Sequence, residues 1–206
     1  MYVPAQFTAP DDALAQLLAA PGAVDLVSST PDGLTATTLP MLHDPVARTL
    51  TGHLARNNTQ WRDTVGEVLV IVRGPDAYVS PSWYASKAEH GRVVPTWDYV
   101  VAHVHGELVA HTDPEWLAAH VAGLTGAHEA GRAQPWAVTD APERFVAGQL
   151  RAIVGVEVRI SRVEAKWKTS QNRPAADVDG VVAGLLADGE AATAAAVQLT
   201  HPGERG

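Results

Sequence analysis

The sequence predicts a mixed α+β fold built on a β-barrel with peripheral helices. Short strand patterns separated by early turns outnumber the helical patterns, which is typical of a barrel or a sandwich. Residues 68–72 are apolar at every position, as expected for a strand buried on both faces in a small barrel that helices cover. A β-sandwich produces a similar string of strands, so it stays open as an alternative.

Turn signals and capping residues separate the predicted elements. The strands are expected, in chain order, over residues 23–29, 34–42, 49–54, 67–73, 77–80, 100–111 and 154–163. The helices are expected over residues 10–20, from residue 114 onward, and over residues 142–152, 174–187 and 191–199. Asp113 is expected to cap the second helix, with Pro114 in its first turn. Gly74-Pro75-Asp76 is expected to turn the chain between the fourth and fifth strands.

Composition and charge limit the possible classes of function. The chain has 206 residues, 46% of them apolar and 18% charged, which is enough for a real core in one full domain or in one domain with a small appendage. Its net charge of −8 disfavours direct binding to nucleic acid, because neutralising phosphates requires a basic face. The absence of cysteine excludes disulfides, zinc–thiolate sites and thiol catalysis. Without a signal peptide or an apolar run of membrane-spanning length, a cytoplasmic location is expected.

Four of the six tryptophans lie in short runs that are dense in amides, hydroxyls and cations. These are Trp61, Trp83, Trp97 and Trp167. A tryptophan that serves only as core usually has apolar neighbours at helix or strand spacing. Rings combined with amides and cations suit a flat, polar-edged, anionic ligand, because the rings stack and the cations bind a phosphate.

Each run also has a plainer interpretation. Residues 55–58 place a guanidinium, two amides and backbone N–H groups at a strand end, which suits a phosphate, but an Asn-rich turn with a surface arginine fits equally well. Residues 80–84 leave the sheet, because Pro81 donates no ladder hydrogen bond, and rings in such a loop are more often buried than ligand-facing. Residues 166–173 form either a solvated basic loop or a ligand loop held in place by Trp167.

Other chemistries have less support in the sequence. His103 and His105 share a strand face with Glu107 at a spacing known from metal sites, but hydrogen-bonded histidines are the more common explanation and no metal site is predicted. The Gly-x-Ser-x-Gly, Gly-x-Gly-x-x-Gly and Walker motifs do not occur. No catalytic acid or base is assigned; Tyr84, His103 and Asp98 are candidates only because they lie in or near the motifs.

Taken together, the runs resemble the PaiB family of FMN-binding negative transcriptional regulators. The resemblance is carried by Met1-Tyr2-Val3-Pro4 with Phe7, Ala36-Thr37-Thr38-Leu39-Pro40, Gly52-His53-Leu54-Ala55-Arg56-Asn57, Gly74-Pro75-Asp76-Ala77-Tyr78-Val79-Ser80-Pro81-Ser82-Trp83-Tyr84, Val93-Val94-Pro95-Thr96-Trp97, Ala152-Ile153-Val154-Gly155, Lys166-Trp167-Lys168 and Ser170-Gln171-Asn172-Arg173. Three positions depart from the family pattern. Thr38 stands where the family usually has His, Thr59 stands where it usually has Pro, and Asp98 stands where it usually has Asn.

The resemblance implies an FMN-binding split β-barrel of the pyridoxamine-phosphate-oxidase-like class, homodimeric, with the flavin at the subunit interface. It implies a split-barrel domain over residues 1–173, followed by a C-terminal helical extension over residues 174–206 that packs on the barrel. It also implies negative transcriptional regulation, with a flavin-dependent oxidoreductase as the alternative. The charge disfavours direct contact with DNA, so regulation is expected to act through a partner or a sensed metabolite.

The resemblance also implies where the cofactor is held. The candidate FMN-binding residues are Thr37, Thr38, His53, Arg56, Asn57, Ser80, Ser82, Trp83, Lys168, Gln171, Asn172 and Arg173. Arg56, His53 and Asn57, with Lys168, are expected at the phosphate. The two threonines, the two serines and Trp83 are expected along the ring, and residues 171–173 are expected to reach in from the C-terminal loop. Asp98 is expected to add negative charge near this site.

Overall fold

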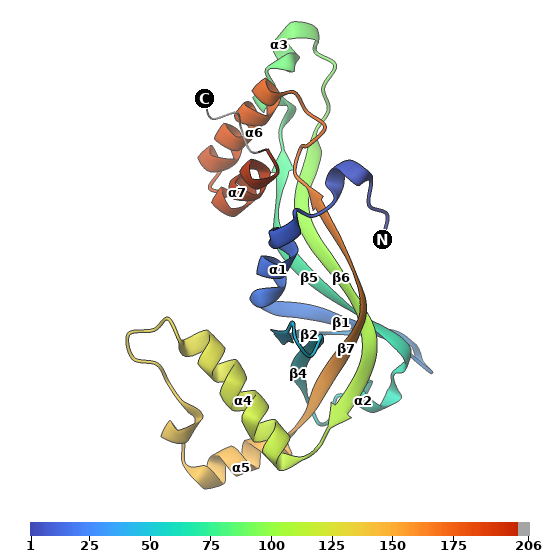
Figure 1. The fold of residues 1–206 in the computed structure, drawn as a ribbon, viewed down its shortest axis with the longest axis vertical. Helices are drawn as coiled ribbons and strands as arrows, with labels where there is room; N and C mark the ends of the chain where they lie inside the picture. Colours follow the sequence, from blue (N-terminus) through green and yellow to red (C-terminus); the bar gives the residue numbers. More distant parts are fainter. Residues whose placement is uncertain (202–206) are drawn as a thin grey trace. The chain divides into compact units, whose positions relative to one another are not determined.

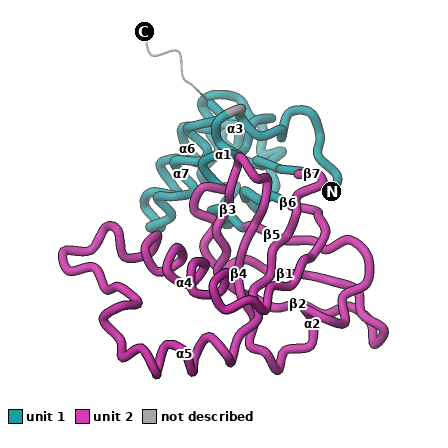
Figure 2. Tube along the Cα trace, turned by 60° about the horizontal axis from the view of Figure 1, so that its bottom comes forward, with its two compact units in different colours: residues 1–17, 73–102, 164–206 teal, residues 18–72, 103–163 magenta. Residues whose placement is uncertain are grey.

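The computed structural model describes residues 1–201 and divides them into two compact units (Figures 1 and 2). Unit 1 comprises residues 1–17, 73–102 and 164 onward, and unit 2 comprises residues 18–72 and 103–163. Three strands run from one unit into the other, because the unit boundaries fall inside β5 (Val65–Val79), β6 (Thr96–His111) and β7 (Ile153–Lys168). Residues 202–206 of the predicted C-terminal extension lie outside the described residues.

Unit 2 contains parts of all seven strands of one antiparallel sheet. Its other strands are β1 (Ala23–Thr30), β2 (Gly33–Pro40), β3 (Leu42–Asp44) and β4 (Thr49–Ala55). The strand order is β2-β1-β5-β6-β7-β4-β3, and β4 pairs with β7 so that His53 lies opposite Gly155. Alternate residues of β1, β4, β5 and β7 are buried, which produces one apolar face. Leu26, Leu50, Val70 and Val156 are among the fully buried members of this core.

The sheet of unit 2 closes on itself. β2 lies at one edge of the strand order, yet it contacts β4 near the other edge. Gly52 of β4 permits this approach, because a Cβ there would lie 2.8 Å from Leu39 Cδ1 and 3.1 Å from the Pro40 carbonyl oxygen. The unit is therefore a small barrel rather than an open sheet or a sandwich.

The helices of unit 2 are peripheral to the barrel. They are α2 (Gln60–Asp63), α4 (Pro114–Glu129), the 3₁₀ turn η3 (Val138–Asp140) and α5 (Glu143–Arg151). Asp113 caps α4, since its Oδ2 accepts a hydrogen bond of 3.0 Å from the backbone N–H of Trp116. The Trp116 ring lies directly on β7, because a Cβ at Gly155 would come within 2.1 Å of it.

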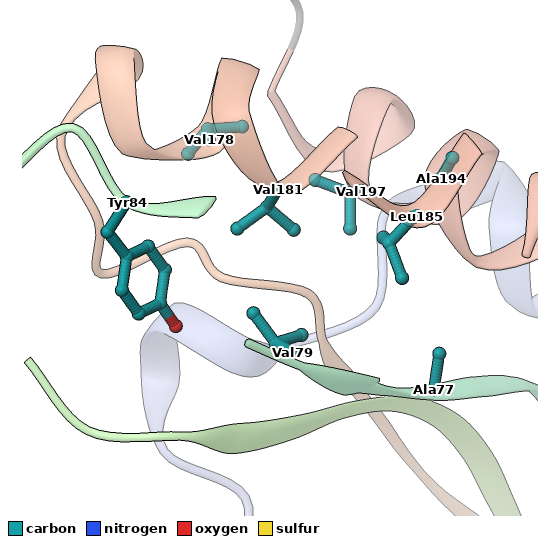
Figure 3. Close-up of a cluster of buried hydrophobic side chains, with 8 residues drawn as sticks. All are labelled: Ala77, Val79, Tyr84, Val178, Val181, Leu185, Ala194 and Val197. Carbon is teal, nitrogen blue, oxygen red and sulfur yellow. The ribbon is translucent and has the colours of Figure 1, made fainter. Parts of the chain in front are cut away.

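Unit 1 contains two helix-bearing clusters. In the first, α6 (Ala175–Ala187) and α7 (Ala191–Thr200) pack on the end of β5, where Val79 faces Val181 and Val197 and Ala77 lies opposite Leu185 (Figure 3). In the second, the buried Trp167 packs among alanines of α1 (Asp11–Ala19) and α7. Three short elements complete the unit: η1 (Ala5–Phe7), η2 (Pro81–Trp83) and α3 (Ser86–His90).

The predicted fold class, a mixed α+β barrel with peripheral helices, is confirmed. The predicted turn at residues 74–76 is wrong, because β5 continues through these residues to Val79. The predicted strand over residues 34–42 is two strands, β2 and β3. The run over residues 68–72 is fully buried on one face only, since Leu69 and Ile71 are half-buried. Among residues 1–201, no helix is both long and apolar enough to cross a bilayer.

Candidate functional site

Arg56 lies at the end of β4, where the chain turns away from the barrel of unit 2. Its Nε donates to the carbonyl of Arg151 at 2.7 Å, and its Nη2 donates to the carbonyl of Ile153 at 2.9 Å. The guanidinium thus caps the C-terminal end of α5, where a cation is electrostatically favoured. Two of its five N–H donors are used, and Nη1 has no partner among residues 1–201. The exposed guanidinium is therefore held in one orientation, and its Nη1 donors remain available to a ligand.

A partly buried hydrogen-bond network fixes the turn that follows Arg56. Asn58 Nδ2 donates to Thr37 Oγ1 at 2.9 Å, and that hydroxyl donates to Gln60 Oε1 at 2.6 Å. Gln60 is buried, and its Nε2 donates to the Leu26 carbonyl and to the Ser28 hydroxyl. Thr37, a predicted ring-lining residue, therefore uses its hydroxyl to fasten this turn to the barrel.

Thr38 and Asn57 are the exposed members of the same group. Thr38 Oγ1 donates to Asp25 Oδ1 at 2.6 Å across the β1–β2 pair, so it faces away from Thr37. Asn57 is exposed beside Arg56, and its amide makes no hydrogen bond among the described residues. Of the predicted phosphate group, Arg56 and Asn57 are adjacent and both offer donors to solvent.

His53 belongs to a stack of aromatic rings in unit 2. Its Nδ1 lies 3.2 Å from His120 Nε2, and His120 in turn stacks on Trp116 with ring centroids 5.2 Å apart. His111 also stacks on Trp116, with ring centroids 4.1 Å apart, and contacts Glu157. Burial lowers the pKa of His53, and burial together with His53 lowers the pKa of His120 to about 4. Both imidazoles of the pair are therefore neutral at pH 7.

A pocket of about 220 Å³ opens beside His53. Its walls come from α4, η3, α5 and the start of β7, and they include two unusually exposed rings, Trp136 (47%) and Phe145 (59%). Leu150 and Ile153 line it as well, and the Ile153 carbonyl is the one that Arg56 binds. Ile153 therefore links the pocket to the exposed residues Arg56 and Asn57 at the end of β4, which we call the Arg56 rim.

Lys168 lies in unit 1, and its ammonium is fully used there. It donates to Thr96 Oγ1 at 2.7 Å and to the carbonyl of Trp97, and it lies 3.5 Å from Asp98 Oδ1. Asp98 is completely buried and accepts a hydrogen bond from the Ser170 hydroxyl at 2.7 Å. Burial raises the pKa of this carboxyl group. The acidic departure at residue 98 is thus an internal group, paired with Lys168.

The remaining candidates from unit 1 are mostly committed to its own loops. Ser80 caps η2 by accepting from the Ser82 backbone, and the Ser82 hydroxyl accepts from Lys87. The Trp83 ring sits in a notch of α6, where a Cβ at Gly184 would come within 2.2 Å of it.

The C-terminal loop shows the same pattern. Gln171 bridges the Thr169 N–H and the Trp167 carbonyl, so it closes the loop on itself. The Arg173 guanidinium lies 4.2 Å above the Tyr84 ring, and Asn172 is exposed.

The candidates thus form two groups, one in each unit. Thr37, Thr38, His53, Arg56 and Asn57 are in unit 2, and the other seven are in unit 1. Sequence reasoning missed His120, Trp116, Trp136 and Phe145. Trp116 and His120 are four residues apart on a predicted helix, which places them on one face of it. This spacing is the sequence pattern that could have identified them as neighbours. Trp136 and Phe145 lie in a loop and on a separate helix, so spacing does not connect them.

Comparison with known families gives one match that covers most of the chain. Residues 1–162 match the family described as "Putative FMN-binding domain". An uncharacterised protein of Aspergillus fumigatus is 33% identical over 165 residues, 69% of this chain and 62% of that protein. The protease synthase and sporulation protein PAI 2 of Bacillus subtilis is 32% identical over 135 residues, 65% of this chain and 62% of that protein. The chain therefore spans less than two thirds of the length of these relatives.

Among solved structures, the FAD and haem binding protein of Mycobacterium smegmatis is similar in fold. The TM-score is 0.58 at 15% sequence identity, over 87% of this chain and 80% of that one. At this level of identity the likeness concerns the fold alone.

Proposed function

We propose, from the premise that this chain belongs to the PaiB family of FMN-binding domains, that it is a homodimeric flavoprotein with a regulatory role. FMN is the cofactor of the family. We propose in addition that the FMN lies between two subunits and that the protein acts in negative regulation of transcription. The observation that carries the proposal is the Arg56 rim of unit 2, an oriented guanidinium with unused donors beside an exposed amide.

The donors at this rim fit the phosphate of FMN. Arginine binds phosphate through paired donors, and Arg56 retains Nη1 for this purpose, while the carbonyls of Arg151 and Ile153 hold its Nε and Nη2. Asn57 adds a neutral amide. His53, predicted at the phosphate, turns its Nδ1 to His120 and lines the neighbouring pocket, so we assign it to that pocket instead. Arg56 and Asn57 would hold the phosphate, and the bound flavin would supply hydride and single-electron chemistry.

The other predicted FMN-binding residues differ in whether their side chains already make contacts within their own unit. Thr37, Lys168 and Gln171 are occupied by hydrogen bonds within their units, so we assign them to positioning the loops. Thr38 is likewise occupied, because it donates to Asp25. Asn172 is exposed and Arg173 lies over the Tyr84 ring, and both remain predicted ring-side residues. Ser80, Ser82 and Trp83 remain predicted ring-lining residues that a second copy of the chain would meet.

The test is a comparison of FMN with riboflavin, which lacks the phosphate. Quenching of flavin fluorescence gives both dissociation constants for the wild type and for Arg56→Ala. A charge-assisted hydrogen bond contributes about 1.5–3 kcal/mol, so loss of Arg56 is expected to weaken FMN roughly tenfold to a hundredfold and to leave riboflavin almost unchanged. Arg62→Ala is the matched control, because Arg62 is an exposed arginine on α2 whose one ion pair among residues 1–201 is with Asp63. Equal loss of FMN and riboflavin would assign Arg56 to folding alone and sink the phosphate assignment.

The regulatory role is proposed to act without direct contact with DNA. The charge of −8 gives little basis for the phosphate contacts that dominate protein–DNA affinity. A fluorescence-anisotropy titration of duplex DNA at several salt concentrations checks this. Affinity that falls steeply with salt would contradict the proposal, because it would indicate a basic DNA-binding face.

A flavin-dependent oxidoreductase is the second candidate, and the pocket beside His53 favours it. This pocket shares Ile153 with the Arg56 rim, so a substrate could lie next to a flavin whose phosphate is bound there. The protein of similar fold from M. smegmatis also binds a flavin by name. Bleaching of bound FMN by a nicotinamide cofactor, followed by reoxidation with an added acceptor, is the expected signature. A flavin that stays oxidised with every donor would reject the oxidoreductase and leave the regulatory role as the remaining candidate.

A further inference from the structure

We propose that the pocket beside His53 is a binding site for an uncharged, flat aromatic molecule of one or two fused rings that carries a hydrogen-bonding atom. Its assignment as the substrate or effector site of the flavoprotein rests on the proposed function. The binding itself rests only on unit 2, where the pocket, its walls and its polar group all lie.

The walls of the pocket fit an aromatic ligand. Trp136 and Phe145 remain 47% and 59% exposed, although each could bury a large apolar surface. Burying apolar surface is favourable, so two half-exposed rings at one pocket are a source of binding energy for a molecule that covers them. Val121, Val146 and Leu150 supply apolar surface between them.

The size of the pocket limits the ligand. Pockets for drug-sized molecules are typically about 300–1,000 Å³, whereas this one is about 220 Å³. One ring or two fused rings suit that volume.

The charge of the lining limits the ligand further. None of the ten described residues that line the pocket is an acid, a lysine or an arginine. A formal charge buried there would lose its hydration without gaining a partner, which is costly. The two polar side chains in the lining are His53 and Gln149, and both are neutral hydrogen-bonding groups.

His53 can either donate a hydrogen bond to a ligand in the pocket or accept one from it. Its Nδ1 is turned to His120 Nε2 at 3.2 Å, and its own Nε2 has no partner among the described residues. The pair shares one proton between the two facing nitrogens, so His53 Nε2 is a donor in one tautomer and an acceptor in the other. A ring nitrogen, a phenol or a carbonyl on the ligand could therefore be recognised.

Calorimetric titration of the flavin-free protein with quinoline tests the proposal. Quinoline has two fused rings, one acceptor nitrogen and no charge at pH 8. We expect a single site of sub-millimolar affinity, at least about tenfold stronger than for N-methylquinolinium, which has the same shape and a fixed charge. Trp136→Ala and Phe145→Ala are each expected to weaken quinoline about tenfold. Tyr2→Ala is the matched control, because Tyr2 is an 82% exposed aromatic residue outside the pocket.

A second comparison tests the hydrogen bond. His53→Phe is expected to weaken quinoline several-fold while leaving naphthalene, which has no acceptor, unchanged. Equal effects on both probes would remove His53 from the recognition and overturn that part of the proposal. Unfolding midpoints of all variants show whether each retains its fold.

Three outcomes would overturn the proposal as a whole. The first is absence of saturable quinoline binding while FMN still binds, which leaves the proposed function intact. The second is competition between FMN and quinoline, which would make this the flavin ring's own site. The third is conversion of the Trp136 and Phe145 variants to monomers, which would show that a second copy covers the pocket. Quinoline binding in a protein that fails to bind FMN would support the pocket and reject the flavoprotein assignment.

Discussion

Gly155 shows how a single position shapes the candidate site. The Trp116 ring occupies the space where a side chain would begin, since a Cβ at Gly155 would lie 2.1 Å from Trp116 Cζ3. We expect Gly155→Ala to displace this ring and the two imidazoles stacked on it, at a cost of at least about 2 kcal/mol in the free energy of unfolding. Urea denaturation followed by circular dichroism measures the loss.

Gly126→Ala is the matched control for that substitution. Gly126 lies in α4, exposed, and a Cβ added there would have no atom within 4 Å. Alanine is therefore expected to stabilise the protein by about 0.5–1 kcal/mol, because glycine is a poor helix former. Similar destabilisation by both substitutions would mean that the Trp116 contact is not the cause.

His120 makes the stability of the protein depend on pH. Its pKa in the folded chain is about 4, against an ordinary value of 6.5, because the ring is buried beside His53. Between these two pH values the unfolded chain binds a proton that the folded chain does not. The contribution of His120 to the free energy of unfolding is therefore fully present above pH 6.5 and is lost as the pH falls towards 4. The loss amounts to about 3 kcal/mol, and the lowered pKa of His53 acts in the same direction.

Urea midpoints at pH 7.5 and pH 5 measure this effect. His120→Gln is expected to be less stable than the wild type at pH 7.5, because it loses the stack on Trp116. It is also expected to lose less stability on acidification, so the two curves converge. Parallel pH profiles for the two proteins would assign the acid sensitivity to other groups.

The His53–His120 pair also marks the limit of sequence reasoning at this scale. The motif around His53 predicts a phosphate ligand, and the partner of this histidine lies 67 residues further along the chain. No local spacing connects the two, because β4 and α4 meet only in the folded barrel. The motif predicts the position of His53 on a strand, and the neutral imidazole pair follows from tertiary packing alone.

At the scale of elements, α4 carries two rings of the site, Trp116 and His120, and depends on its cap. Asp113→Ala removes the hydrogen bond to the Trp116 N–H and is expected to cost about 1 kcal/mol of stability. Asp113→Asn is the control, because asparagine caps helices about as well as aspartate. Thermal unfolding of both variants checks the prediction. A loss for asparagine as large as for alanine would point to the charge of Asp113 rather than its cap.

The strands show which elements the sequence predicts and where it is misleading. Alternating apolar residues locate β1, β4 and the centres of β6 and β7, and Asp113 with Pro114 locates the start of α4. Gly74-Pro75-Asp76 reads as a turn, yet β5 passes through it. Its pairing with β1 ends at Ile71, so the N–H that Pro75 lacks is not needed by that strand. Gly74 is required for close packing, because a Cβ there would lie 2.7 Å from Val100.

At the scale of the whole molecule, an FMN site between two subunits couples cofactor binding to assembly. If each flavin contacts two chains, FMN binds the dimer better than the monomer, and dimerisation and FMN binding strengthen each other by the same factor. At a fixed concentration of free FMN, bound FMN per chain is therefore expected to fall as the protein is diluted through its dimer dissociation. Equilibrium dialysis measures the bound flavin, and sedimentation velocity gives the oligomeric state in the same samples.

The Arg56→Ala variant provides the control for this coupling. With its phosphate contact removed, added FMN is expected to shift the dimer dissociation far less than in the wild type, while the flavin-free proteins dimerise alike. This control assumes that Arg56, which bonds to the Arg151 carbonyl within its own unit, makes no subunit contact, and equal dimerisation of the flavin-free proteins checks that. If bound FMN per chain stays constant while the wild type passes from dimer to monomer, one chain contains the complete flavin site, and the proposed interface position is wrong.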